Sequence, residues 1–331
     1  MAKRAEVKIY NNDNPFQNWE LEEEFIYEQL WDLEYGENPQ QEAGIYKSKD
    51  FADFEIIDDK ILTYNEILTL NELSNITSEF YDVCAVAFVK HAAPCGVALA
   101  PTIEQAYNKA FDCDPMSSFF GSIGFTQKVN IEIAEHLSSM NVKVIVAPDY
   151  EPDALSVLKR NSNLKIVKLN TPLKKFKEFF QKDIHITPFG TLYQYSNKIN
   201  LSQNSFNIVT KTKPTKEQIE DAVFAWKISK YSRSNSVIIA KDFKTTAIAQ
   251  GFVSPIPAVE VALDIACDNS KDAIMVSDTY LPTIDCINAA AQGRISMIIQ
   301  PGGAKNEDKI IELADKYNIS MVLTGIKNYK H

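Results

Sequence analysis

Two uninterrupted apolar runs, each ending at a lysine, recur in the pattern of this chain. Residues 83–89 (VCAVAFV) lead into Lys90, and residues 237–240 (VIIA) lead into Lys241. Continuous apolar runs of this length are typical of strands that are buried on both faces of a sheet. The sequence therefore predicts two buried strands, each of which carries a cation at its end.

An amphipathic helix is predicted after each of these strands. Within residues 103–111, Ala106, Ala110 and Phe111 share one helical face. A comparable pattern occurs near residues 259–267. The two regions therefore begin in the same way.

The correspondence continues further along the chain. Each region has an apolar strand ending in proline, then a helix, then another apolar strand: residues 142–148, 153–160 and 164–169 in one, and residues 295–301, 307–317 and 319–325 in the other. This order of strand, helix and strand, present twice, predicts an α/β layered fold built by duplication.

Three parts of the chain are predicted from this pattern. We expect an N-terminal arm over residues 1–30, which holds too few apolar residues for a core of its own, a first domain over residues 31–200 and a second over residues 201–331. The boundary near residue 200 lies in a stretch of polar turns and prolines.

Composition limits the class of protein. The chain has 331 residues, 45% hydrophobic and 24% charged, enough for two domains with cores. It has no apolar run of membrane-spanning length, and its first residues lack the apolar stretch of a signal peptide. We therefore expect a cytoplasmic protein without membrane contact.

Charge and cysteine content narrow the class further. A formal net charge of -10 argues against nucleic-acid binding, so any anionic substrate must be held by local cations. The five cysteines are an odd number without metal-binding spacing, so neither a disulfide framework nor a zinc site is predicted.

The segment FVKHAAPCGVA, residues 88–98, carries the strongest candidate chemistry. A buried strand delivers Lys90 and His91 into a turn, and the ends of strands are where α/β folds place their chemistry. His91 exchanges a proton near neutral pH, and the adjacent ammonium favours its neutral, basic form. Pro94 and Gly96 are expected to shape the turn and to let a ligand approach the backbone. A solvated Lys–His pair at a strand end fits these residues equally well.

Two further segments are candidate binding elements. The run YGENPQQ, residues 35–41, forms a turn with backbone and amide donors, and alone it is typical of a simple turn. The run KYSRSNSV, residues 230–237, places hydroxyl groups and Asn235 before a strand, where the amide is able to form two hydrogen bonds with a ligand. A polar loop between helix and strand fits this second run as well.

Taken in order, nine segments resemble one known family. They are YGENPQQ, LTYNE, VKHAAPCGVA, DPMSSFFGSIGF, VIVAPDYEPDAL, FAWKISKYSRSNSV, SDTYLP, IIQPGG and TGIKNYKH. Together, over roughly residues 30–331, they resemble the AICAR transformylase domain of the AICAR transformylase/IMP cyclohydrolase family, without the cyclohydrolase domain. The resemblance implies a duplicated cytidine-deaminase-like layered fold, with mixed sheets flanked by helices and no zinc.

The resemblance also implies a reaction and a set of site residues. The reaction is transfer of the formyl group of 10-formyltetrahydrofolate, a co-substrate, to the 5-amino group of AICAR, in a homodimer with its sites at the subunit interface. His91 is the expected base and Lys90 the group that stabilises the oxyanion. The implied site residues are catalytic Lys90, His91 and Asn235; substrate-binding Tyr35, Gly36, Glu66, Lys327 and His331; and folate-binding Asp114, Ser117, Ser254 and Pro282.

Several positions depart from the family pattern, mostly on the nucleotide side. Glu34 stands where the family has an arginine that grips the substrate phosphate, and Glu66 replaces an asparagine. In QGFVSPI, residues 250–256, Pro255 stands at the arginine position of the family motif. A carboxylate repels a phosphate, so Lys327 or another cation has to compensate. Two alternatives therefore stay open: a related folate-dependent formyltransferase for a different amine, and a non-catalytic ligand-binding subunit.

Overall fold

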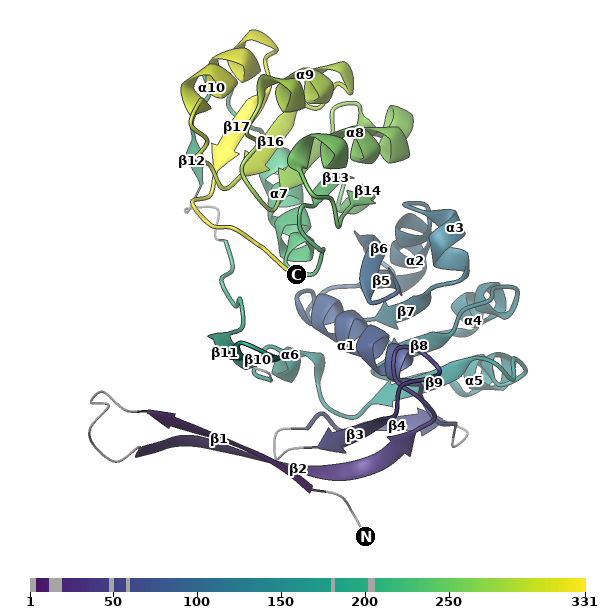
Figure 1. Cartoon of the computed structure of the whole chain (residues 1–331). Helices are drawn as coiled ribbons and strands as arrows, with labels where there is room; N and C mark the ends of the chain where they lie inside the picture. The colour runs from purple at the N-terminus through teal and green to yellow at the C-terminus, as the bar shows by residue number, and fades with distance from the viewer. Residues whose placement is uncertain (1–3, 12–19, 48–50, 58–59, 180–181, 202–205) are drawn as a thin grey trace.

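The computed structural model describes residues 4–11, 20–47, 51–57, 60–179, 182–201 and 206–331. Within them, one mixed sheet of twelve strands runs through the molecule (Figure 1). Its spatial order is β12 (Asn207–Ile208), β17 (Ser320–Leu323), β16 (Met297–Gln300), β15 (Ile274–Ser277), β13 (Val237–Lys241), β14 (Lys244–Ala249), β6 (Ala93–Leu99), β5 (Ala85–Lys90), β7 (Ser122–Phe125), β8 (Val144–Ala147), β9 (Lys165–Leu169) and β4 (Phe54–Ile57).

The order of the strands reads the same outward from the middle in both directions. Strands β6, β5, β7, β8, β9 and β4 of the first half match β14, β13, β15, β16, β17 and β12 of the second. The helices match too: α1 (Tyr64–Ser78) with α7 (Lys216–Ser229), α2 (Ile103–Phe111) with α8 (Pro255–Ala266), α4 (Ile131–Ser138) with α9 (Ile284–Gln292), and α5 (Pro152–Leu158) with α10 (Glu307–Lys316). This arrangement confirms a duplicated, mixed α/β fold. We call the junction of β6 and β14 the seam.

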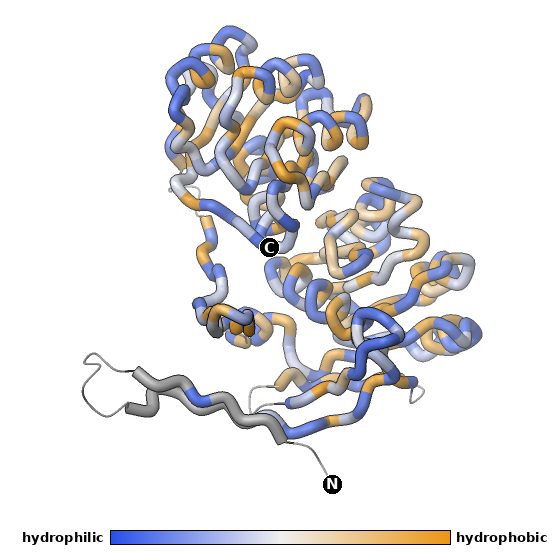
Figure 2. The backbone as a smooth tube through the Cα atoms, in the orientation of Figure 1, coloured by the Kyte–Doolittle hydropathy of each residue, from blue (hydrophilic) through white to orange (hydrophobic). Residues whose placement is uncertain are grey.

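Apolar residues concentrate in the strands and on the inner faces of the helices (Figure 2). Among the described residues, one buried cluster belongs to the first half and another to the second, whereas a third is shared by both. In the shared cluster the rings of Phe80, just after α1, and Phe224, in α7, lie 5.5 Å apart and are almost fully buried. The hydrophobic core therefore crosses from one half to the other.

The innermost strands of each half are joined by a two-residue turn. His91 and Ala92 connect β5 to β6 with φ angles of 52° and 53°, and Asp242 and Phe243 connect β13 to β14 with 53° and 55°. Two successive left-handed residues match the right-handed twist of a hairpin, although glycine and asparagine are the usual occupants. Both turns are therefore tight and conformationally defined.

The local sequence predicted some of these elements well. The helix over 103–111 is confirmed as α2, and the strands expected before Lys90 and Lys241 are β5 and β13. The helix expected near 259–267 begins earlier, at Pro255, whose fixed φ suits the first turn of a helix. Strands β6 and β14 were not anticipated. For β6 the reason is that it contains Pro94 and Gly96, which are uncommon inside strands.

Smaller elements lie outside the main sheet. Strands β1 (Arg4–Asn11), β2 (Glu20–Leu33) and β3 (Ala43–Lys47) form an antiparallel sheet, and β10 (Lys182–Thr187) pairs with β11 (Gly190–Tyr195) between the two halves. The remaining elements are α3 (Pro115–Phe119), α6 (Leu173–Phe176) and the 3-10 helix η2 (Cys267–Ser270).

Residues 1–3 and 12–19 of the expected N-terminal arm lie outside the described residues. Strand β2 runs past residue 30, where the arm was expected to end. The division at residues 30 and 200 stays a prediction. None of the helices in the described segments is long and apolar enough to cross a membrane.

Candidate active site

Pairing across the seam brings the Lys90–His91 turn to the second half. Strands β6 and β14 run antiparallel with Ala98 opposite Lys244, and the Leu99 amide donates to the Phe243 carbonyl at 2.9 Å. The β5–β6 turn therefore points toward the C-terminal end of β14. There the Gln250 side chain donates from Nε2 to the Pro94 carbonyl at 2.8 Å.

Lys90 and His91 occupy different environments at this turn. The Lys90 side chain is partly buried, with its Nζ 5.8 Å from the centre of the Phe120 ring, a distance at which an ammonium and an aromatic face attract. His91 is exposed, and its positive φ places it at the tip of the hairpin. The pair therefore offers a cation anchored at a strand end and an accessible imidazole beside it.

Gly96 serves packing and not access for a ligand. A Cβ atom at this position would lie 2.2 Å from the Ala110 carbonyl oxygen of α2. The expectation that Gly96 opens the turn to a ligand was therefore wrong: it lets β6 approach α2, and the turn itself is formed by His91 and Ala92.

Asn235 lies on a loop that is fixed to the same end of the seam. Its peptide bond with Ser234 is cis. Its backbone amide and its Nδ2 both donate to the Phe252 carbonyl, at 2.8 and 2.9 Å. The Arg233 amide donates to Gln250 Oε1 at 3.1 Å. Gln250 thus bonds both to the hairpin of the first half and to the loop of the second.

A buried carboxylate supports the Asn235 loop from behind. Asp278 is fully buried and accepts from Ser234 Oγ at 2.6 Å and from the Ser236 amide at 2.9 Å. Burial raises the pKa of Asp278, although these hydrogen bonds oppose that shift. The Asp278 carbonyl also accepts from the Asn328 amide at 3.1 Å, which ties the C-terminal segment to the loop.

The C-terminal segment brings two more predicted residues to this end. The Ser234 amide donates to the Lys330 carbonyl at 2.9 Å, so His331 follows directly beside the loop. His331 is exposed, with its ring 5.9 Å from that of Tyr329. Lys327 Nζ lies 5.4 Å from the ring of Tyr280 and 5.2 Å from that of Tyr329. Pro282 follows Tyr280 by two residues. The C-terminus lies between the two halves (Figure 1).

The predicted folate-side residues open two helices. Asp114 caps α3 by accepting from the Ser117 amide at 2.9 Å, and α3 is followed by Phe120, the ring beside Lys90. Ser254 precedes α8 and lies two residues after Phe252, the partner of Asn235. Asp114 and Ser117 therefore lie close in sequence to the ring beside Lys90, and Ser254 lies close to the partner of Asn235.

Tyr35, Gly36 and Glu66 lie elsewhere in the chain. The Gly36 amide donates to the Gln41 carbonyl at 2.7 Å within the turn. Glu66 caps α1 by accepting from the Thr63 amide at 2.8 Å, and its other oxygen is 2.6 Å from Lys165 Nζ. Lys165 belongs to β9, near the outer edge of the sheet. In a single chain these three residues are not brought to Lys90 and Asn235.

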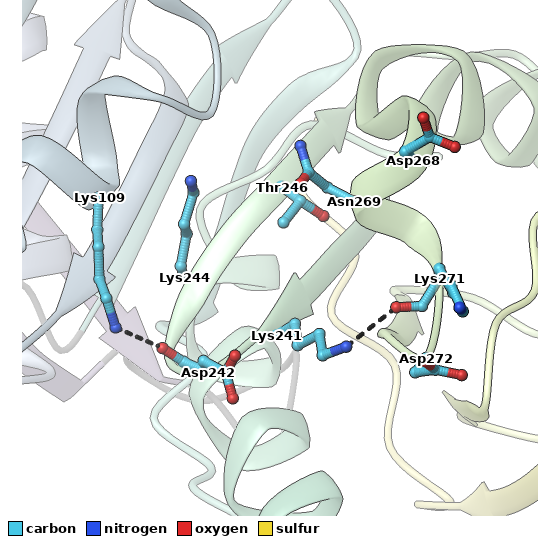
Figure 3. A pocket seen from close by; sticks show the side chains of 9 residues that line it. All are labelled: Lys109, Lys241, Asp242, Lys244, Thr246, Asp268, Asn269, Lys271 and Asp272. Carbon is cyan, nitrogen blue, oxygen red and sulfur yellow. Dashed lines mark hydrogen bonds between the residues drawn. The ribbon is translucent and has the colours of Figure 1, made fainter.

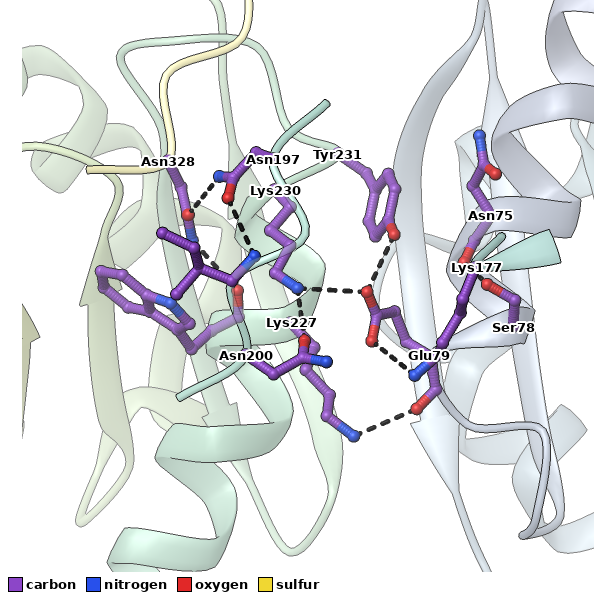
Figure 4. A network of polar contacts seen from close by, with 12 residues as sticks. Asn75, Ser78, Glu79, Lys177, Asn197, Asn200, Lys227, Lys230, Tyr231 and Asn328 are labelled. Carbon is purple, nitrogen blue, oxygen red and sulfur yellow. Dashed lines mark hydrogen bonds and ion pairs between the residues drawn. The ribbon is translucent and has the colours of Figure 1, made fainter. Parts of the chain in front are cut away.

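Sequence reasoning missed a buried polar network between the halves (Figure 4). Glu79, after α1, lies 3.2 Å from Lys230 and 3.1 Å from Lys177, and its carbonyl accepts from Lys227 at 3.0 Å. The Tyr231 hydroxyl donates to the same carboxylate at 3.0 Å. The one signal in the sequence was the spacing of Lys227 and Lys230, one helical turn apart just before the Asn235 loop.

Charge balance in this network is uneven. Burial raises the pKa of Glu79, but attraction by Lys230 and Lys177 outweighs it and leaves the pKa below the ordinary value. Burial lowers the pKa of Lys230, and its attraction to Glu79 only partly opposes that effect. One carboxylate interacts with several lysines. The attraction therefore outweighs burial for the pKa of Glu79 but not for the pKa of Lys230.

The part of the chain that the structure describes holds no group of three His, Cys, Asp or Glu side chains arranged to bind a metal ion. The residues that do converge are a strand-end lysine and histidine, an amide on a bonded loop, and side chains from the C-terminal segment. They define a duplicated α/β protein with a candidate active site across its seam.

Comparison with known proteins gives this class a family. Residues 5–265 match the family model described as the AICARFT/IMPCHase bienzyme, and the chain belongs to that family. It is 39% identical over 313 residues to the bifunctional purine biosynthesis protein PurH of Thermoanaerobacter sp. (strain X514), covering 93% of this chain and 60% of the relative. It is 35% identical over 336 residues to the protein of that name from Dictyostelium discoideum, covering 98% of this chain and 62% of the relative. The chain thus spans about three fifths of the length of these relatives.

Proposed function

We propose that this chain transfers the formyl group of 10-formyltetrahydrofolate to the 5-amino group of AICAR, a step of purine biosynthesis. The observation that carries the proposal is the pair of hydrogen bonds made by the Gln250 side chain. They hold the Lys90–His91 hairpin and the Asn235 loop at one end of the seam. Membership of the bienzyme family supports the same reaction.

Each proposed group has a role that its position supports. The amine nitrogen attacks the formyl carbon while the exposed His91 accepts the proton that the nitrogen loses. The Lys90 ammonium stabilises the oxyanion that develops on the formyl oxygen. The bond between the formyl carbon and N10 of the folate then breaks, and N10 takes up a proton. Asn235 Nδ2 is bonded to Phe252, so we assign its Oδ1 to the substrate.

The other predicted residues fall into two groups. Lys327 and His331 lie on the C-terminal segment and are assigned to the nucleotide, and Asp114, Ser117, Ser254 and Pro282 to the folate. Tyr35 and Gly36 lie in the turn between β2 and β3, outside the main sheet, and we infer that they reach the site of a second copy in a homodimer. Both Glu66 oxygens are engaged by Thr63 and Lys165, so Glu66 supports the outer edge of the main sheet and contacts a substrate only if one of these bonds breaks. We place this homodimer in the cytoplasm, without a nucleic-acid or membrane partner.

One observation favours a second candidate function, formyl transfer to a different amine. Glu34 is exposed directly before Tyr35, at the position of the phosphate-binding arginine of the family. A carboxylate there disfavours a phosphate unless a cation neutralises it. The chemistry at Lys90 and His91 is the same in both candidates.

The test is a turnover assay with purified full-length chain, 10-formyltetrahydrofolate and AICAR, in which the appearance of tetrahydrofolate is followed. His91→Asn suits the left-handed backbone but removes the base, and we expect it to lower kcat by about 10²- to 10⁴-fold. Ala92→Gly, a matched change in the same turn, is expected to retain activity. Turnover with another amine but not with AICAR supports the second candidate. Transfer that is unchanged in His91→Asn contradicts both.

A further inference from the structure

A cavity of about 570 Å³ lies at the opposite end of the seam from the candidate active site (Figure 3). It is lined by Lys109, Lys241, Asp242, Lys244, Thr246, Asp268, Asn269, Lys271 and Asp272. These residues come from both halves, since Lys109 belongs to α2 and the others to the second half. The proposed function leaves this cavity without a role.

Two of its four lysines are fixed by backbone carbonyl groups. Lys109 Nζ donates to the Asp242 carbonyl at 3.1 Å, and Lys241 Nζ donates to the Lys271 carbonyl at 3.1 Å. A carbonyl oxygen orients an ammonium but does not neutralise it. Both lysines therefore present positive charge in defined positions.

The carboxylates around the cavity cancel only part of this charge. Asp268 is paired with Arg294 at 3.1 Å, and Lys244 with Asp112 at 3.3 Å. The lining itself has four lysines and three aspartates. The lining thus carries a formal excess of one positive charge in a chain whose net charge is -10. It favours an anion at this place.

The approximate twofold relation of the halves explains how the cavity is framed. Lys241 and Asp242 occupy in the second half the position that Lys90 and His91 occupy in the first, at the start of a two-residue turn. The 3-10 helix η2, which follows α8, stands where α3 follows α2. Aspartate replaces histidine at the tip, so this copy of the hairpin has a cation but not the base.

The lining also defines the kind of ligand. All nine lining side chains are polar or charged and none is aromatic, so the cavity lacks a ring on which a nucleobase or a pteridine would stack. Its size lies within the usual range of small-molecule sites. Lysine ammoniums act as point charges toward phosphate groups.

We propose that this cavity is a second ligand site, which binds a small phosphorylated polyanion. Inorganic pyrophosphate and a sugar phosphate share this chemistry. The site is separate from the proposed active site, because the two turns lie at opposite ends of the seam. It requires neither Lys90 nor His91.

Isothermal titration calorimetry with the full chain at constant ionic strength tests the proposal, with inorganic pyrophosphate in one arm and ribose 5-phosphate in the other. Lys244→Gln combined with Lys271→Gln is expected to weaken binding about tenfold, as for loss of two partly exposed ion pairs. Asp272→Asn is expected to tighten binding by about two- to fivefold, since it removes a negative charge. Asparagine suits the positive φ of 59° at this position, so the fold is retained.

The control is Lys327→Ala, which changes the proposed active site and is expected to leave binding at the cavity unchanged. Binding in only one arm supports the proposal and identifies the source of the phosphate. Absence of binding in both arms overturns it. So does binding that Lys327→Ala abolishes while the double lysine variant and Asp272→Asn leave it unaffected. None of these results depends on formyl transfer.

Discussion

The Glu79 carboxylate lies 3.2 Å from the Lys230 ammonium, and the two side chains are only 6% and 3% exposed. Glu79 follows helix α1 of the first half and Lys230 follows α7 of the second, five residues before Asn235. A buried ion pair adds little net stability, but removal of one partner leaves the other charge stranded. The pair therefore couples the packing of the two halves to the loop of the candidate active site.

Glu79→Gln is expected to lower the free energy of unfolding by about 3 to 5 kcal/mol, because it leaves Lys230 buried without an anionic partner. Chemical denaturation measures the change. Glu135→Gln, on the exposed side of α4, is the matched control and is expected to shift stability by less than about 0.5 kcal/mol. Equal stability of the two variants would show that the buried pair is not needed.

The same residue predicts a dependence of stability on pH. The pKa of Glu79 is lowered from its ordinary value of 4.5 in the folded chain, so its contribution is fully present above pH 4.5. It is lost as the pH falls through the folded-state pKa, below 4.5. The difference in unfolding free energy between the native chain and Glu79→Gln should therefore shrink on acidification below pH 4.5. Urea titrations over a pH series measure it, and a constant difference would contradict the assignment.

Gln250→Ala removes both bonds that join the Pro94 carbonyl to the Arg233 amide. We expect a loss of about 1 to 3 kcal/mol in stability. We also expect a fall in kcat of up to about 100-fold, because the hairpin and the loop are no longer held in register. Gln250→Glu keeps the acceptor for the Arg233 amide but sets a carboxylate oxygen against the Pro94 carbonyl, so it should also lower kcat. If kcat is unchanged in both variants, Gln250 does not position the site.

Gly96→Ala is expected to destabilise the chain by about 1 to 3 kcal/mol, because overpacking forces the surrounding backbone to shift. The added Cβ would meet the Ala110 carbonyl oxygen at 2.2 Å. Gly44→Ala is a useful comparison, since the nearest atom there is 3.3 Å away on the Tyr46 side chain, which is able to move. Thermal unfolding of the two variants measures the contrast. Similar midpoints would argue against a tight contact between β6 and α2.

Elements with a strong local pattern were predictable from the sequence, and long-range contacts were not. Helix α2 follows from its apolar face alone, and the placement of Lys90 follows from the buried run before it. The bond of Gln250 to Pro94 joins residues 156 positions apart, and a glutamine leaves no periodic trace of such a partner. The same holds for Glu79, whose partners come from two separate segments, at residue 177 and at residues 227–231. The residues of the candidate site were thus predictable from the sequence. The hydrogen bonds of Gln250 and the ion pairs of Glu79, which hold the surrounding segments in place, were not.

The hydrophobic cluster shared by the two halves has a consequence for how the protein folds. Phe80 and Phe224 cover each other across the boundary, so neither half retains its full core when separated. Cleavage of the chain near residue 200 would expose apolar rings on both fragments and favour their aggregation. The duplicated halves should consequently unfold together, as a single calorimetric unit, although each has a cluster of its own.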